Sequence, residues 1–159
     1  MIVVVADDFT GAAEMAGIGL RHGLSVDIVI EGADISTETE MLVIATDTRS
    51  KGSGEAIHEM RTLSSHIKSL PFSFLYKKVD SVMRGHMLEE IRALKETLGI
   101  QRALVIPANP QLGRVIIDGH YYVNGKPLQH TSFSSDPDFN IASSSVRELL
   151  HRNEADPSF

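Results

Sequence analysis

The stretch "VVVADDFTGAAEMAG", residues 3–17, places two adjacent aspartates directly after an apolar run. Residues 2–5 are continuously apolar and rich in β-branched side chains, which predicts a strand that is buried on both faces. Residues 11–22 carry apolar side chains at helical spacing and are followed by Gly23, which is typical of a helix closed by a glycine. The stretch therefore predicts a strand, a tight acidic loop and a helix in succession.

The same alternation continues along the chain. Further short apolar runs are bounded by polar loops, and between them lie segments whose apolar residues recur every three or four positions. Such alternation of buried strands with helices predicts an α/β fold, with an open, mostly parallel sheet flanked by helices. The expected strands cover residues 25–30, 41–45, 74–79 and 102–106, and the expected helices cover residues 55–70 and 88–98.

The pattern changes after the fifth expected strand. Residues 115–131 have strand-like composition, and Asn124-Gly125 within them is typical of a two-residue hairpin turn. Ser145 and Glu148 have the spacing of a capping box, which predicts a last short helix. We therefore expect a β-hairpin excursion after the fifth strand of the sheet.

Length and composition predict a single domain. The chain has 159 residues, of which 42% are hydrophobic and 23% charged, as in soluble globular proteins. We expect one α/β domain over residues 1–152 and a frayed tail over residues 153–159. The formal net charge is −6 and no basic stripe is present, so a nucleic-acid partner is not expected. The absence of cysteine excludes disulfides, thiolate metal ligands and a cysteine nucleophile.

Neither a membrane segment nor a metal site is expected. No stretch approaches the ~20 consecutive apolar residues that cross a bilayer. The apolar run at residues 2–6 is too short for a signal segment, and aspartates follow it at once. The seven histidines show no paired spacing typical of zinc ligands. These features favour a cytoplasmic protein.

Polar loops follow four of the expected strands, at residues 7–11, 47–49, 80–85 and 109–114. In an open parallel sheet the carboxyl ends of all strands lie along one edge, and ligands bind in the crevice there. Arginine binds a carboxylate with two parallel hydrogen bonds, and aspartate accepts hydrogen bonds from hydroxyl groups. The sequence therefore predicts a cleft for a small polyhydroxylated acid. The residues expected around this cleft are Asp7, Asp8, Asp47, Arg49, Asp80, Arg84 and Arg114.

Each loop also has a purely structural interpretation. Aspartate and asparagine at strand ends commonly form turns or cap the next helix, and either Asp8 or Thr10 fits the cap of the first helix. For any one loop this interpretation is slightly favoured. Because four loops carry such residues and three of them carry an arginine, the set as a whole favours a binding site.

Several uncommon motifs occur in the order expected of one known family: "ADDFTGA", "KVDSVMRG", "PANPQLGR", "DGHYYVNGKPLQHT" and "SDPDF". From Val3 to about Leu150 the chain resembles the N-terminal, substrate-binding part of the four-carbon acid sugar kinases. Members of that family have two domains, of which the first holds a tetronate-type acid sugar and the second binds ATP. The resemblance implies phosphorylation of a hydroxyl group of threonate, erythronate or 3-oxo-tetronate.

The resemblance also implies a set of substrate contacts. We infer that Arg84 and Arg114 bind the carboxylate of the sugar acid. Asp8 or Asp80 would orient a hydroxyl and accept its proton, with preference for an aspartate of the opening motif. Phosphoryl transfer needs mainly positioning and charge neutralisation, so a weak base suffices. The candidate substrate-binding residues are Asp7, Asp8, Thr10, Gly11, Arg49, Lys78, Asp80, Ser81, Arg84, Gly85, Gly113 and Arg114, with Asp8 and Asp80 as catalytic candidates.

The resemblance covers the family's first domain, and we expect no counterpart of its ATP-binding domain within residues 1–159. The resemblance implies ATP and Mg²⁺ as cofactors, bound mainly by that domain. We therefore expect this chain not to turn over ATP alone, and to work with a C-terminal nucleotide-binding domain or a partner chain, or as a homodimer. Val82 and Met83 stand where the family usually has Thr and Leu, so the particular acid stays open.

Two other functions remain open. A haloacid dehalogenase-like phosphatase also begins with a buried strand, aspartates and a threonine, but its two aspartates are separated by one residue. Asp7 and Asp8 are adjacent, and we expect them to point to opposite sides of an extended segment. The non-catalytic alternative is a sugar-acid-binding module that buries an exposed sheet edge against a partner chain.

Overall fold

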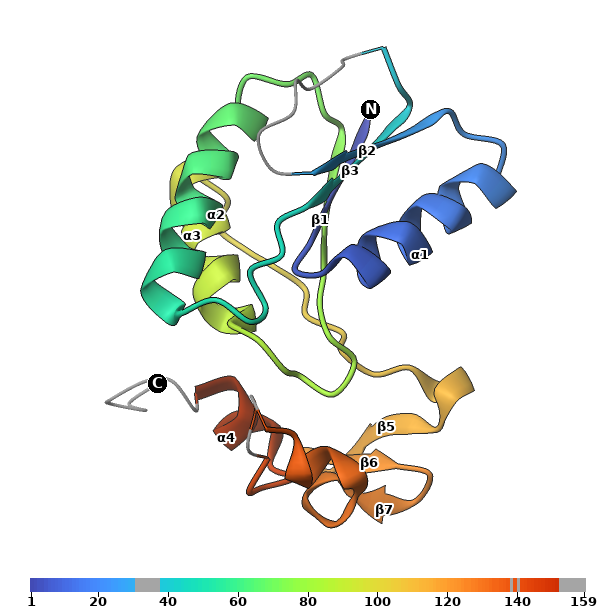
Figure 1. Ribbon diagram of the computed structural model, residues 1–159, viewed down its shortest axis with the longest axis vertical. Coiled ribbons are helices and arrows are strands. Elements are labelled where there is room, and N and C mark those ends of the chain that lie inside the picture. The colour runs from blue at the N-terminus through green and yellow to red at the C-terminus, as the bar shows by residue number, and fades with distance from the viewer. Residues whose placement is uncertain (31–37, 138, 140, 152–159) are drawn as a thin grey trace.

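Four parallel strands form the main sheet, in the order β2-β3-β1-β4 (Figure 1). The structure, a computed structural model, describes residues 1–30, 38–137, 139 and 141–151. The expected α/β fold, an open parallel sheet flanked by helices, is confirmed. The elements of this part are β1 (Ile2–Ala6), α1 (Phe9–Arg21), β2 (Val26–Ile30), β3 (Met41–Ala45), α2 (Ser53–Ile67), β4 (Phe74–Lys78) and α3 (Met87–Leu98).

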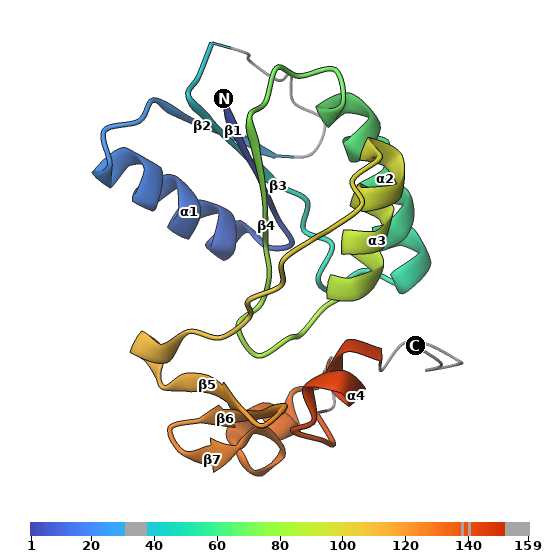
Figure 2. The same cartoon turned by 180° about the vertical axis from the view of Figure 1, so that it is seen from behind.

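Strands β1 and β3 form the centre of the sheet. Val4 and Val43 are register partners, and both are fully buried. One face of these strands packs against α1 through small residues such as Ala16. The other face packs against α2 and α3 through Met60 and Leu94, and Figure 2 shows the helices on the two sides. The helices on both faces explain why these strands are apolar at every position.

The start of α1 and the end of α3 are each capped by a single residue. The side chain of Asp8 accepts a hydrogen bond from the Gly11 amide at 2.8 Å, so Asp8 and not Thr10 caps α1. Helix α1 consequently begins at Phe9, two residues before the expected start. Helix α3 ends at Leu98 and is capped by Gly99, which has a left-handed φ of 71°. Within the described ranges, none of the helices combines the length and apolarity that a membrane span needs.

The chain after residue 106 forms a second, three-stranded antiparallel sheet with short helices. We call residues 107–151 the hairpin lobe and residues 1–106 the sheet lobe. Asn124 and Gly125 have φ values of 50° and 76°, which confirms the expected hairpin turn. The elements of the hairpin lobe are η1 (Pro110–Leu112), β5 (Arg114–Ile117), β6 (His120–Val123), β7 (Lys126–Pro127), η2 (Leu128–His130), η3 (Ser132–Ser135) and α4 (Val146–His151).

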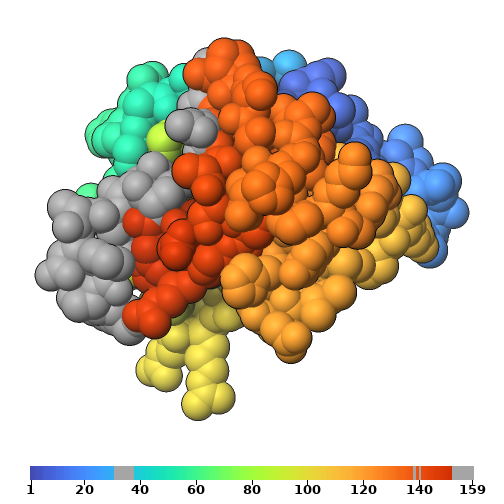
Figure 3. Space-filling view, turned by 90° about the horizontal axis from the view of Figure 1, so that it is seen from below, coloured from blue at the N-terminus to red at the C-terminus, as the bar shows by residue number. Residues whose placement is uncertain are grey.

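The hairpin lobe packs against the carboxyl edge of the sheet lobe. Figure 3 looks onto this lobe, coloured orange to red, with parts of α1 and α2 visible behind it. One half of the expected capping box is present at α4, where the Glu148 amide donates to Ser145 Oγ at 3.4 Å. The Ser145 amide donates to Ser143 Oγ at 3.0 Å. The expected frayed tail, residues 153–159, lies outside the described residues. A shared core joins the two lobes and contains Val82, Met83, Met87, Tyr121, Leu128, Ile141 and Leu149.

The expectation of a fifth parallel strand is wrong. Residues 102–106 form no strand, and the side chains of Leu104 and Ile106 are 87% and 67% exposed. An apolar segment becomes a strand only where a neighbouring strand supplies backbone partners, and none of the described strands pairs with this one. Strand β4 therefore stands at the edge of the described sheet, with Phe74 and Tyr76 exposed. The hairpin lobe consequently follows a four-stranded parallel sheet.

Candidate functional site

Arg49 joins the first two polar loops at the carboxyl edge of the sheet. Its Nε and Nη2 each donate to an oxygen of Asp7 at 2.9 Å, and its Nη1 donates to Asp8 at 2.6 Å. Burial lowers the pKa of Arg49, but the hydrogen bond that Arg49 donates to Asp7 and the charges of Asp7, Asp80 and Asp8 outweigh burial, so the net shift is upward. Both forks of this guanidinium are therefore occupied by the protein's own carboxylates.

The expectation that Asp7 and Asp8 point to opposite sides is wrong, because one guanidinium contacts both. The regular alternation of side chains holds within the ladder of a strand, and β1 ends at Ala6. Beyond that point Asp8 serves as the helix cap, and the planar fork of Arg49 reaches both carboxylates. The two aspartates thus form one unit with Arg49.

The third loop folds around the carboxylate of Asp80. Its Oδ2 accepts hydrogen bonds from the amides of Val82 and Arg84, each at 3.1 Å. The Arg84 side chain adds bonds from Nε at 3.1 Å and from Nη2 at 2.9 Å. Burial raises the pKa of Asp80, but these bonds and the charges of Arg84 and Arg49 outweigh burial and lower it. The carboxylate of Asp80 is therefore held ionised, with its oxygens engaged.

Arg84 connects this loop to the hairpin lobe. Its Nη1 donates to Oδ2 of Asp136 at 3.1 Å. The hydrogen bond to Asp80 is the main cause that raises the pKa of Arg84, burial opposes it, and Asp136 raises it further. The guanidinium carbons of Arg84 and Arg114 lie 5.8 Å and 5.5 Å from the ring centre of Phe133, which is cation–π distance. Two arginines from different loops thus meet one aromatic ring.

Arg114 comes from the fourth polar loop and contacts the third. Its Nη1 donates to the hydroxyl of Ser81. Tyr121 Oη donates to the backbone oxygen of Ser81 and, at 3.3 Å, to that of Pro107. Burial raises the pKa of Tyr121 to about 12, which the charge of Arg114 opposes and that of Asp80 supports. Arg49 Nη1 also forms a longer ion pair with Asp80 Oδ1, at 3.9 Å. Through these contacts residues of all four loops form one continuous cluster of hydrogen bonds and ion pairs.

Gly11, Lys78 and Gly85 lie directly against this cluster. A Cβ atom on Gly11 would stand 2.6 Å from Asp8 Oδ1 and 3.2 Å from Lys78 Cγ, so a side chain there would displace the cap. Gly85 has a φ of 81°, and a Cβ atom on it would lie 3.2 Å from Asp7 Oδ2. Both glycines therefore allow the backbone to approach the aspartates closely.

Three candidate residues lie outside the hydrogen-bonded cluster. Thr10 and Asp47 have exposed side chains. Gly113 packs against the hairpin turn, where a Cβ atom would stand 2.1 Å from Asn124 Oδ1. The position of Gly113 is therefore explained by the turn.

A buried polar layer under the cluster was not expected from the sequence. Glu90 of α3 accepts a hydrogen bond from Thr48 Oγ1 and forms an ion pair with Lys77 Nζ at 2.7 Å. The side chains of Glu90 and Lys77 are only 2% and 8% exposed. Thr48 directly precedes Arg49, so this pair supports the loop that carries the central guanidinium. Tertiary packing between α3 and β4 brings the two side chains of this pair together, so no motif in the sequence predicts it.

Asp136 and Phe133 also contact the arginines of the cluster, although neither was among the residues expected around the cleft. The available signal was the motif "SDPDF", which contains Asp136. Among the residues that the structure describes, no group of three or more His, Cys, Asp or Glu side chains is placed to hold a metal ion. The aspartates instead have guanidinium partners, so the cluster does not fit a metal cage.

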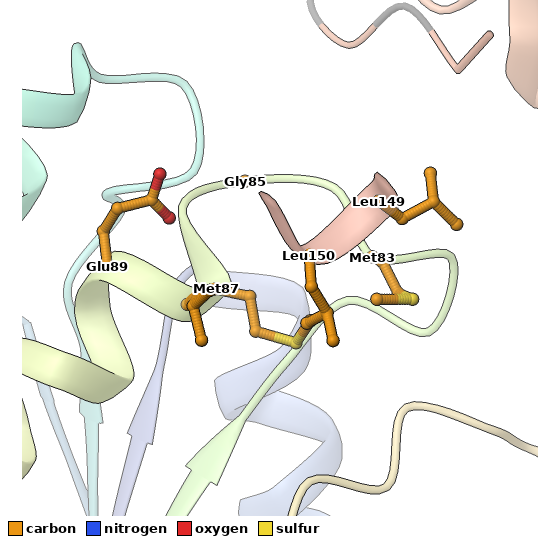
Figure 4. Close-up of a pocket in the computed structure, with 7 residues that line it drawn as sticks. Met83, Gly85, Met87, Glu89, Leu149 and Leu150 are labelled. Atoms are coloured by element: carbon orange, nitrogen blue, oxygen red, sulfur yellow. The ribbon is translucent and has the colours of Figure 1, made fainter. Parts of the chain in front are cut away.

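A hollow beside the cluster is lined mainly by apolar side chains (Figure 4). It lies between the start of α3 and helix α4, and Gly85 belongs to its lining. Apart from Glu89 its side chains are apolar, so it presents no cation to an organic acid. Its lining residues are Met83, Gly85, Met87, Leu88, Glu89, Leu149 and Leu150.

Comparison with known proteins gives consistent matches over nearly the whole chain. A family model described as "Sugar-binding N-terminal domain" matches residues 2–158. The chain is 31% identical over 151 residues to the D-threonate kinase of Salmonella typhimurium, covering 94% of this chain and 36% of that protein. It is 32% identical over 154 residues to the 3-oxo-tetronate kinase of Brucella melitensis, covering 92% and 35%.

A solved structure from Bordetella bronchiseptica has the same fold. It is a domain-swapped dimer with bound citrate, and it matches with a TM-score of 0.85 at 31% identity. The match covers 94% of this chain and 40% of that one. This chain therefore spans little more than a third of the length of the proteins that it matches.

Proposed function

We propose that this chain, which belongs to the sugar-binding N-terminal domain family of the four-carbon acid sugar kinases, binds the acid sugar that such a kinase phosphorylates. The observation that carries the proposal is a cluster in which Arg49 and Arg84 pair with aspartates, while Arg114 donates to the Ser81 hydroxyl beside them. Guanidinium groups suit the carboxylate of a sugar acid, and carboxylates suit its hydroxyl groups. The citrate bound by the Bordetella bronchiseptica relative, a hydroxy acid, is in keeping with this chemistry.

Within the cluster we assign carboxylate binding to Arg84 and Arg114. Arg49 is the less suitable candidate, because Asp7 and Asp8 occupy both of its forks. Arg84 uses one fork for Asp80 and has a single hydrogen bond to Asp136 on the other side. This arrangement supports a carboxylate subsite on the outer side of Arg84.

For the hydroxyl that is phosphorylated we favour Asp8 over Asp80. Asp80 already accepts hydrogen bonds from two amides and from the Arg84 side chain, and its pKa lies below the ordinary value. Asp8 is more exposed, at 23% against 8%. We therefore give Asp80 the task of holding Arg84 and Asp8 the task of orienting the hydroxyl and accepting its proton.

The kinase names of the relatives imply ATP and Mg²⁺ in general terms. Asp7, Asp8 and Asp80 of the cluster are paired with arginines, and no metal cage is found among the described residues. We propose that ATP and Mg²⁺ bind mainly to a nucleotide-binding domain or partner chain. The Asp7 carboxylate accepts from Arg49 through both oxygens, which disfavours the phosphatase alternative, because that reaction needs a free nucleophilic aspartate.

The exposed apolar edge supports a partner at the β4 side of the sheet. Phe74 and Tyr76 of β4 are exposed there, as are Leu104 and Ile106. We propose that a further domain or partner chain covers this edge, as an uncovered apolar edge promotes association. Light scattering coupled to size exclusion tests this proposal. Leu104→Lys should weaken the association, whereas Leu20→Lys, at an exposed position of α1, should not.

Titration calorimetry with the purified protein tests the proposed ligand class. D-threonate, D-erythronate and 3-oxo-tetronate should bind, and neutral erythritol should bind at least about tenfold more weakly, because it lacks the group that the arginines recognise. Arg84→Met should reduce acid affinity, with Arg61→Met, an exposed arginine of α2, as the matched control. Equal affinities for acids and erythritol would contradict the proposal.

A further inference from the structure

The guanidinium of Arg84 has two edges with different partners. The edge formed by Nε and Nη2 is held by Asp80, with bonds of 3.1 Å and 2.9 Å. The remaining nitrogen, Nη1, donates to Asp136 at 3.1 Å. Asp80 belongs to the same loop as Arg84, whereas Asp136 comes from the hairpin lobe. The outer side of Arg84 is therefore occupied by a carboxylate from the other lobe.

Asp136 is held in place by the segment around it. Its Oδ1 accepts a hydrogen bond from the Phe139 amide at 3.1 Å, and its own amide donates to the carbonyl of Phe133 at 3.3 Å. Oδ2 is the oxygen that faces Arg84. A single hydrogen bond to a partly exposed arginine can be exchanged for another carboxylate, while the bond to the Phe139 amide remains.

Phe133 gives both arginines a support that does not depend on Asp136. Its ring lies 5.8 Å from the guanidinium carbon of Arg84 and 5.5 Å from that of Arg114. The ring packs against the shared core of the lobes. Cation–π contact attracts a guanidinium without using its hydrogen-bond donors. The outer N–H groups of Arg84 would therefore remain positioned after Asp136 leaves.

We propose that Asp136 is a resident competitor, which occupies the carboxylate subsite of Arg84 in the empty protein and is replaced there by the carboxylate of the ligand. This inference rests on the proposed function, and it adds a residue of the hairpin lobe that sets the affinity for the acid. A ligand without a carboxylate cannot take over the bond to Nη1, so Asp136 stays in place and the affinity for neutral sugars does not depend on it. For an acid the exchange lowers the net affinity, because one charge-assisted bond is lost for each one gained.

Calorimetry of D-erythronate and of its neutral amide, erythronamide, tests the proposal. Asp136→Asn removes the competing charge at nearly constant shape. It should strengthen D-erythronate binding by about tenfold, the size expected for one charge-assisted hydrogen bond, and leave erythronamide within about twofold. Asp118→Asn is the matched control, since it removes one charge from an exposed position of the same lobe. That control should leave both affinities unchanged.

The outcomes separate this inference from the proposed function. If the unmodified protein binds D-erythronate and Asp136→Asn binds it equally or more weakly, the competitor role is overturned and the proposed function stands. If neither protein binds the acid, both are overturned. Asp136→Ser provides a second variant should Asp136→Asn fail to fold, and it carries the same expectation. Phe133→Leu should weaken acid binding, and unchanged binding would overturn the support role of the ring.

Discussion

The two lobes bury their apolar residues in different ways. In the sheet lobe, β1 and β3 are apolar at each position, and the helices on both faces bury them. In the hairpin lobe, Tyr121, Leu128 and Ile141 come from separate segments and are buried in the core that this lobe shares with the sheet lobe. Burial in the first lobe follows from local pattern, while burial in the second depends on the assembly of distant segments. The candidate site lies where the two kinds of structure meet.

Arg84 lies at the boundary between the two lobes and forms hydrogen bonds in both. It is held by Asp80 within its own loop and by Asp136 from the hairpin lobe. The first contact joins residues four apart in sequence, and the second joins residues 52 apart. A site built in this way has a fixed part and an exchangeable part. The following substitutions test whether the two lobes differ in stability and in how they unfold.

The largest effect is expected at the buried ion pair of the sheet lobe. Glu90→Ala should lower the free energy of unfolding by about 3–5 kcal/mol, because Lys77 would remain buried without a partner. The paired replacement Glu90→Leu with Lys77→Met should recover most of this loss. Urea denaturation measures both. A loss below about 1 kcal/mol would show that the pair is not part of the rigid lobe.

Matched leucine truncations compare the two cores directly. Leu42 of β3 and Leu128 of η2 are both fully buried. Each change to alanine deletes the same atoms, and each should cost about 2–5 kcal/mol of local stability. Amide hydrogen exchange should show loss of protection throughout the sheet for Leu42→Ala, but mainly within residues 107–151 for Leu128→Ala. Equal, global loss in both variants would mean that the lobes unfold as one unit.

The substitution Asp80→Asn tests the loop between β4 and α3, which contacts the hairpin lobe through Arg84. We expect a loss of about 1.5–3 kcal/mol at neutral pH, because the charge-assisted bonds with Arg84 weaken. The pKa of Asp80 is lowered on folding, so its contribution is present above the ordinary aspartate range and is lost as pH falls through the folded value. Melting curves at pH values from about 5 down to about 2 should therefore fall less steeply in the variant. Identical slopes would contradict the assignment.

The smallest effect is expected at Tyr121. Tyr121→Phe should cost about 1 kcal/mol, because Ser81 loses a hydrogen bond to its carbonyl. Burial raises the pKa of Tyr121 from 10.0 to about 12, so its contribution is present below pH 10 and is lost as pH rises through 12. Alkaline melting curves measure this, with Tyr122→Phe as the control. Equal effects of both changes would argue against a specific bond.

The sequence was sufficient for most of the sheet lobe and for the meeting of its loops. Strands such as β1 and β3 are apolar throughout, and a glycine closes α3. The convergence of Arg49 and Arg84 followed from the rule that parallel strands end at one edge. Arg114 instead begins β5 of the hairpin lobe, since the strand expected before it does not form. Each of these inferences used a local pattern together with one general rule of topology.

Features that depend on partners distant in sequence were not predictable in this way. Residues 102–106 have a strand-like composition, but no described strand pairs with them. The contacts of Asp136 and Phe133 with arginines arise because the hairpin lobe folds back onto the sheet edge. Glu90 and Lys77 meet across a helix–sheet interface. None of these contacts has a fixed sequence spacing that could announce it.

A crystal structure of the protein with D-erythronate or D-threonate tests the central claim most directly. The account predicts the ligand carboxylate within hydrogen-bond distance of Arg84 or Arg114, a ligand hydroxyl facing Asp8, and Asp136 displaced from Nη1 of Arg84. A ligand bound at the hollow between α3 and α4, or with its carboxylate remote from both arginines, would contradict it.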